Sequence, residues 1–150
     1  MKALLQRVKK ASVVVDGDVV GRIDHGLVVF IGVAQSDTEK DVYYLADKVC
    51  KLRIFADAAS KFNLSVADVC GQILVVSQFT LLAETRKGRR PSFTEAAPPD
   101  KAEALFTLFI NCIRETGLQV ETGRFKKHML VEIDNDGPVT ILIDSKDKLP

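Results

Sequence analysis

The stretch Leu27-Val28-Val29-Phe30-Ile31-Gly32-Val33 constrains the fold of this chain more than any other. It is apolar at every position, whereas a strand with one face in water alternates apolar and polar residues. The pattern therefore predicts a strand that is buried on both faces. The apolar run is far shorter than the roughly 20 residues that a helix needs to span a bilayer. We therefore expect it inside a packed domain and not in a membrane.

Two turns on the N-terminal side divide the preceding residues into strands. Asp16-Gly17-Asp18 contains the Asp-Gly pair that tolerates positive φ in tight hairpins. It separates a strand over Leu4–Val15 from a strand over Val19–Ile23, and Asp24-His25-Gly26 forms the second turn. Strands joined by such short turns are predicted to pair with each other.

Two helices follow, and each is marked by signals at its ends. Ser36 and Glu39 fit a capping box that opens the first helix, and apolar residues recur at helical spacing within Thr38–Leu52. Pro98-Pro99-Asp100 starts the second helix, because proline is tolerated in the first turn, and Gly117 ends it. Each helix has one apolar face, which must pack against another element.

The remaining strands complete the expected fold. Ile73–Val76 is a second buried strand, and Met129–Ile133 and Val139–Ile143 are two late strands separated by a turn over residues 134–138. The pattern predicts an α/β fold with a single domain over residues 1–150. Its sheet is mostly antiparallel or mixed and barrel-like, with two main helices packed on one side. The order of the strands does not follow from the sequence.

Composition and cysteine spacing exclude several classes of protein. Apolar residues make up 47% of the 150, enough for a core, and the formal net charge of +1 is not that of a globally basic nucleic-acid binder. Cys50, Cys70 and Cys112 are odd in number and far apart, which argues against a disulfide framework and a thiolate metal site. We expect reduced, mostly buried thiols in a cytoplasmic protein that uses no metal and no cofactor. The apolar run within residues 1–7 is too short for a signal peptide.

Common catalytic motifs are absent: the sequence has no P-loop, no G-x-G-x-x-G, no H-E-x-x-H and no G-x-S-x-G. A triad that joins Ser77 to His25 or His128 is one conceivable route to a nucleophile. The alternative is that both histidines are ordinary surface residues.

Three polar segments stand out instead, and each has a plain structural interpretation as well as a functional one. Ser77-Gln78-Phe79-Thr80 follows a buried strand, where hydrogen-bonding side chains need partners or a ligand, unless this is only a solvated strand end. Arg86, Lys87, Arg89 and Arg90 place four cations in five positions, which suits phosphate contacts or an ordinary solvated loop.

The third segment, Asn135-Asp136-Gly137-Pro138-Val139-Thr140, has the composition of a hairpin turn. The bond before a proline favours trans by only about 0.5–1 kcal/mol, so a fold can hold Gly137-Pro138 cis. Two successive carbonyls that point the same way would then form a rigid acceptor pair for an ammonium group.

With these segments the sequence resembles the D-aminoacyl-tRNA deacylase family. Ser77–Leu81 matches the family's SQFT motif and Asn135–Thr140 its N-x-GPVT motif, in the right order and in a chain of the right length. Leu82 and Arg89 depart from residues common in the family. Further matches lie in the opening strand and the basic loop: Arg7-Val8, Ala11-Ser12-Val13, Lys87-Gly88 and Arg90-Pro91-Ser92-Phe93.

The resemblance implies a homodimer that hydrolyses the ester bond of D-aminoacyl-tRNA, with each site at the subunit interface. One subunit supplies the catalytic segment Ser77, Gln78, Phe79 and Thr80. The other inserts Gly137-Pro138, expected to be cis and braced by Arg7, to hold the substrate's amino group. L side chains would then collide with backbone, while glycine would not, so glycyl-tRNA should also be hydrolysed. The basic loop Arg86–Arg90 would bind tRNA.

Three alternatives remain open from the sequence. The chain could be a nucleic-acid-binding dimer without catalysis, which uses the basic loop alone. It could be a purely structural dimer. It could also be a relative with a trans Gly-Pro bond that edits other mischarged tRNAs.

Overall fold

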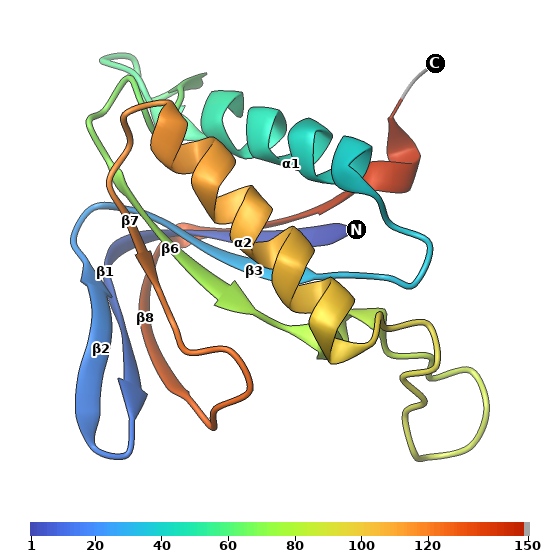
Figure 1. Cartoon of the computed structure of the whole chain (residues 1–150). Coiled ribbons are helices and arrows are strands. Elements are labelled where there is room, and N and C mark those ends of the chain that lie inside the picture. The colour runs from blue at the N-terminus through green and yellow to red at the C-terminus, as the bar shows by residue number, and fades with distance from the viewer. Residues whose placement is uncertain (149–150) are drawn as a thin grey trace.

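The computed structural model of the protein describes residues 1–148. A curved sheet lies under two helices that cross one of its faces (Figure 1). No helix within these residues is both long and apolar enough to cross a membrane. The elements are β1 (Lys2–Val15), β2 (Asp18–Ile23), β3 (Gly26–Gly32), α1 (Glu39–Lys51), β4 (Phe55–Ala56), β5 (Phe62–Leu64), β6 (Gln72–Ser77), the 3-10 turn η1 (Phe79–Leu82), α2 (Pro99–Glu115), β7 (Val120–Thr122), β8 (Leu130–Asp144) and the 3-10 turn η2 (Ser145–Asp147).

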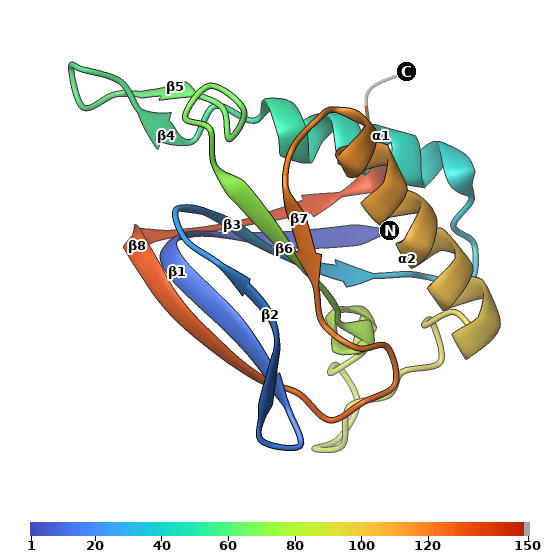
Figure 2. The ribbon, with the colours of Figure 1, turned by 60° about the vertical axis from the view of Figure 1, so that its left-hand side comes forward.

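The long strand β1 organises the sheet. Its first half pairs with β3 and its second half with β2, while β8 pairs with it along most of its length, all antiparallel. Beyond β3 the strands β6 and β7 add in parallel, so the sheet is mixed. The sheet curls until β2 lies beside β7 (Figure 2). A Cβ on Gly21 would lie 2.6 Å from the Thr122 carbonyl oxygen, so the absence of a side chain at Gly21 allows this close approach. This nearly closes a barrel, as expected for the fold.

Two apolar layers explain why β3 is apolar at every position. Leu27, Val29 and Ile31 face the layer between the sheet and the helices, which includes Leu45 and Phe109. The intervening Val28 and Phe30 face a second layer inside the curled sheet. Because successive side chains of a strand point to opposite faces, a strand with two buried faces has no polar position.

The C-terminal strands differ from the sequence prediction. Instead of a hairpin of two strands, both halves form the single strand β8, and both pair with β1. Gln6 pairs with Thr140 and Val8 with Asn135, so residues 136–139 bulge outward opposite Arg7. The Asn135 side chain accepts a hydrogen bond from the Val139 N–H at 2.8 Å and closes this bulge locally. A turn-like composition therefore marks a bulge and not a reversal of the chain.

The first helix begins later than its predicted capping box implies. Ser36 lies in a tight turn in which the Ala34 N–H donates to the Asp37 carboxylate at 2.6 Å, so helix geometry cannot start there. Thr38 is the N-cap, and its N–H donates to the Asp41 carboxylate at 2.8 Å. The buried Asp37 is held in place by the ammonium group of Met1 at 2.6 Å.

The cysteines are free, as expected, but only Cys50 is buried, while Cys112 is half-buried and Cys70 is exposed. The strands β4, β5 and β7 were not predicted, because segments of two or three residues carry no measurable periodicity.

Candidate active site

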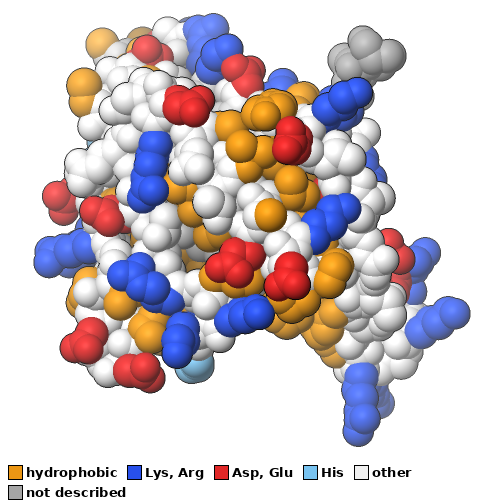
Figure 3. Space-filling model, viewed as in Figure 1, with side chains coloured by type: hydrophobic (Ala, Val, Ile, Leu, Met, Phe, Trp, Pro, Cys, Tyr) orange, Lys and Arg blue, Asp and Glu red, His pale blue; other side chains and the backbone are white. Residues whose placement is uncertain are grey.

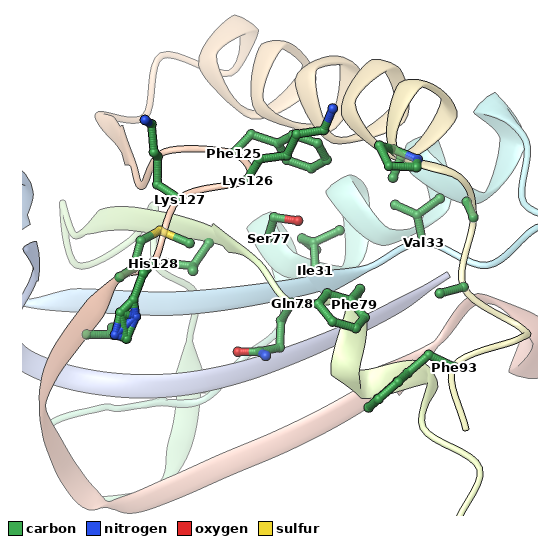
Figure 4. Close-up of a pocket in the computed structure, with 17 residues that line it drawn as sticks. Ile31, Val33, Ser77, Gln78, Phe79, Phe93, Phe125, Lys126, Lys127 and His128 are labelled. Carbon is green, nitrogen blue, oxygen red and sulfur yellow. The ribbon is translucent and has the colours of Figure 1, made fainter. Parts of the chain in front are cut away.

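A cavity of about 670 Å³ opens where β6 ends (Figure 4). Its sides are the turn η1, the segment that enters α2, and the segment 123–129 that joins β7 to β8. Aliphatic side chains from β3 and β6 form part of its lining, and three phenylalanines stand around it. The lining residues include Ile31, Val33, Val76, Phe79, Phe93 and Phe125.

The predicted catalytic segment lies at this cavity. Ser77 ends β6, and the Gln78 N–H still donates to the Ile31 carbonyl of β3 at 2.7 Å before the chain turns into η1. Ser77, Gln78 and Phe79 line the cavity, whereas Thr80 does not. The Gln78 amide instead donates a hydrogen bond to the Thr80 hydroxyl. The structure thus brings three of the four residues to one opening and joins the fourth to them through a side chain.

Phe79 is unusually exposed for an aromatic residue, at 56% of its surface. Its ring meets Phe93 edge-on at 5.1 Å between centroids. Together they form an apolar flank beside Gln78, and the exposed ring of Phe79 offers a surface on which a nucleobase or an aromatic side chain can stack.

Gly32 is a positioning residue that the sequence analysis did not single out. A Cβ on Gly32 would lie 2.5 Å from the Leu82 side chain and 3.1 Å from the Gln78 carbonyl. The absence of a side chain therefore lets η1 pack closely on the end of β3 and sets the place of Gln78. A glycine inside an otherwise apolar strand was the available sign, because it often marks a close backbone approach.

Gly137 and Pro138 lie elsewhere. Both are exposed, neither lines the cavity of its own chain, and the bond between them is cis, as expected. Arg7 holds the bulge from beneath: its Nε donates to the Asp136 carbonyl at 3.0 Å and its Nη1 to the Ile54 carbonyl at 2.8 Å. The guanidinium also stacks over Phe62, 5.4 Å from the ring centroid. The bulge is therefore held firmly while its outer surface stays open.

The basic loop projects from the molecule beyond η1. Backbone hydrogen bonds between Glu84 and Ser92, at 2.8 and 3.0 Å, close it at its base. Arg86 pairs with Glu84, and these hydrogen bonds lower the pKa of the Glu84 carboxyl to about 2. In the part of the chain that the structure describes, the other three cations of the loop, Lys87, Arg89 and Arg90, form no ion pair. Cationic side chains stand out at this corner of the surface (Figure 3).

The two histidines differ in position. His25 lies before β3, at the far end of β6 from Ser77, and packs edge-on against Phe55 at 5.2 Å, so it cannot serve Ser77. His128 lines the cavity, but within residues 1–148 it makes no hydrogen bond to Ser77. The same residues contain no group of three His, Cys, Asp or Glu side chains that could hold a metal ion.

The fold and the cavity define a class: a single-domain α/β protein with a curled mixed sheet and a cavity of about 670 Å³, flanked by phenylalanines, at a strand end. The sequence model of the D-Tyr-tRNA(Tyr) deacylase family matches residues 4–144. The chain belongs to this family, whose members are hydrolases.

Individual relatives agree with the family match. The D-aminoacyl-tRNA deacylase of Dehalococcoides mccartyi (strain CBDB1) is 60% identical over 149 residues, which cover 99% of this chain and 97% of the relative. The D-aminoacyl-tRNA deacylase of Thermotoga petrophila is 59% identical over 145 residues, 97% of each chain.

Two solved structures share the fold. One, described as "c-Myc DNA Unwinding Element Binding Protein", superposes with a TM-score of 0.90 at 40% identity, over 96% of this chain and 98% of the other. Another, described as "Structural Analysis of a probable eukaryotic D-amino acid tRNA deacylase", has a TM-score of 0.82 at 18% identity, over 95% of this chain and 97% of the other.

Proposed function

We propose that this protein hydrolyses the ester bond between a D-amino acid and the 3′-terminal adenosine of tRNA. The observation that carries the proposal is the cavity beside Ser77 and Gln78. Its volume of about 670 Å³ suits a small-molecule-sized group, its phenylalanines suit a nucleobase, and cations stand nearby to meet a polynucleotide backbone. Relatives at about 60% identity carry the matching name.

The working unit in this proposal is a homodimer. Gly137 and Pro138 are exposed and firmly held, yet they do not reach the cavity of their own chain. Exposed apolar side chains on the surrounding surface, Leu142 and Phe62, each at 56%, favour burial against a second copy. The bulge of one protomer would then enter the cavity of the other.

Chiral selection follows from this arrangement by exclusion. The carbonyl groups of Gly137 and Pro138 accept hydrogen bonds from the substrate's α-ammonium group. A D side chain then points into open space, and an L side chain collides with backbone. Glycine has no side chain that could collide with the backbone, so measurable hydrolysis of glycyl-tRNA is expected.

The chemistry needs a placed water molecule and stabilisation of the oxyanion. Phe79 and Thr80 begin η1, and the first N–H groups of a helical turn have no acceptor within it, so these two can meet the oxyanion. Among the described residues, the partner of the Thr80 hydroxyl is the Gln78 amide, a donor and not a base. We therefore assign Thr80 to positioning and activation of the water to the ribose 2′-OH of the substrate.

The tRNA is held by Arg86, Lys87, Arg89 and Arg90, all exposed on one loop near the cavity. Electrostatic contacts of this kind neither need nor imply a cofactor. The cytoplasm is the proposed location, because three free cysteines suit a reducing compartment.

Deacylation of D-tyrosyl-tRNA and L-tyrosyl-tRNA by the purified protein tests the proposal. Fast release of D-tyrosine with negligible release of L-tyrosine is expected, and Thr80→Ala should keep substantial activity. A 2′-deoxy terminal adenosine should abolish the reaction, since it removes the group that activates water. Equal rates on both enantiomers would contradict the selection mechanism. Binding of tRNA without any hydrolysis would favour the non-catalytic alternative.

A further inference from the structure

A second set of basic side chains borders the cavity on the side away from Phe93. Lys126, Lys127 and His128 belong to the segment between β7 and β8, and all three line the opening (Figure 4). All three are exposed, and the two lysine ammonium groups point outward from the apolar interior. Within residues 1–148 neither lysine forms an ion pair.

The backbone that carries these side chains is firmly placed. The Gly123 N–H donates to the Val75 carbonyl of β6 at 3.2 Å, and the Lys127 N–H donates to the Arg124 carbonyl at 3.2 Å. Phe125 packs on Phe106 of α2 at 6.1 Å between ring centroids. The segment is thus tied to the strand that ends at Ser77, so the backbone at Lys126 and Lys127 is held beside the cavity while their exposed side chains can reach over its mouth.

Lys126 has a second unusual property. Its φ of +63° lies in the left-handed region, which is unfavourable for residues with a Cβ and free of that cost for glycine. Non-glycine residues in this region cluster at functional sites, because the surrounding structure must enforce them. Glycine would be the favoured residue at this φ, yet the position carries a lysine at the mouth of the cavity. This combination points to a role for the charge of Lys126.

We propose that Lys126 and Lys127 form a phosphate-binding lip that holds the phosphodiester on the 5′ side of the terminal adenosine. This inference rests on the proposed function and adds a second backbone contact to it. The basic loop Arg86–Arg90 lies beyond the Phe79–Phe93 flank, and the lip lies across the cavity from that flank. A single strand can therefore enter with its last nucleoside in the cavity and its last phosphate at the lip. Lysine acts here as a mobile point charge, which suits an exposed phosphate.

The test compares two substrates that differ in that phosphate: D-tyrosyl-tRNA, and 3′-O-D-tyrosyl-adenosine, which has none. The variant is Lys126→Gly with Lys127→Ala, in which glycine also relieves the unfavourable φ, so wild-type folding is expected. Lys40→Ala is the matched control, because Lys40 is an exposed lysine on α1, an element that does not border the cavity.

The double variant should lower kcat/KM for D-tyrosyl-tRNA about tenfold at low salt, and the loss on D-tyrosyl-adenosine should be at least fivefold smaller. The salt dependence, as log kcat/KM against log salt, should become shallower by about 0.7 to 1.4, for one or two lost single-strand contacts. Equal losses on both substrates, or no loss on tRNA, would overturn the inference.

A binding measurement separates this inference from the proposed function. If the wild-type protein hydrolyses neither substrate, the proposed function fails, but the lip remains testable with a fluorescent RNA ending in CCA. Weaker, less salt-dependent binding by the double variant would support the lip. Unchanged binding, or tighter wild-type binding of a glutamate-rich peptide than of the RNA, would overturn it.

Discussion

Removal of the Arg7 side chain should lower both the free energy of unfolding and the deacylase activity, because Arg7 holds the bulge at residues 136–139. Arg7 donates one hydrogen bond to each of two carbonyls and stacks on Phe62. A hydrogen bond from a charged group contributes about 1.5–3 kcal/mol, and an exposed cation–π contact about 0.5–1 kcal/mol. Because the site is half-buried, the low ends apply, and Arg7→Ala should cost about 3–4 kcal/mol of unfolding free energy.

The loss of activity should exceed what unfolding explains. Small domains have about 5–15 kcal/mol of stability, so the Arg7→Ala protein should remain mostly folded at 25 °C. The Asp136 carbonyl would lose its donor and the bulge would move, and a displacement of about 1 Å at a reacting centre can cost a hundredfold in rate. We expect kcat/KM for D-tyrosyl-tRNA to fall about a hundredfold.

Urea unfolding followed by circular dichroism measures the first effect, and deacylation of D- and L-tyrosyl-tRNA measures the second. Arg7→Lys is the control, since one ammonium group can serve one carbonyl and should recover part of the stability. Wild-type kcat/KM with an unchanged D/L ratio in Arg7→Ala would refute the claim that Arg7 holds the bulge for catalysis.

Three further predictions concern other parts of the molecule. Gly32→Ala places a methyl group against the 79–82 turn and should cost about 1–3 kcal/mol in urea unfolding, together with most of the deacylase activity; full activity would show that the turn can move without consequence. Glu84→Gln removes the carboxylate that pairs with Arg86, so KM for tRNA should fall and the salt dependence of KM should become steeper. Because the pKa of Glu84 is about 2, the decrease in KM should be the same from pH 5 to 8. Cys70 should react with a thiol-specific alkylating reagent before the other cysteines, whose thiols have pKa values raised by burial; peptide mass mapping that finds another cysteine modified first would contradict this.

Local patterns predicted the parts of this fold that local physics controls. The apolar strand β3, the strand β6 and both helices were placed within a few residues, because burial on both faces and helical periodicity leave direct marks in sequence. The first helix cap was misplaced by two residues. In the structure Thr38 and Asp41 form a box of the same spacing, while Asp37 is bound by the Ala34 N–H and by the ammonium group of Met1, 36 positions away, a contact that no local pattern predicts.

The candidate site divides in the same way. The motif Ser77–Thr80 was visible as polar residues at a strand end, and the basic loop as a cluster of charge. Gly32 left only an indirect sign, a glycine in an apolar strand, and nothing in the sequence placed Lys126 and Lys127 at the cavity, because both placements depend on what the folded chain brings beside them.

The sequence by itself determined which segments are buried, where the two helices lie and which short motifs carry polar chemistry, because each depends on neighbours within a few residues. Only the tertiary structure decided that residues 136–139 form a bulge on one long strand and not a hairpin. It also decided that Arg7 lies under that bulge and that the ends of β6 and β7 frame one cavity. The first two features depend on pairing between β1 and β8, more than a hundred residues apart, and the third on pairing between β6 and β7. The free energy of such pairing comes from sheet hydrogen bonds and burial that no local pattern records.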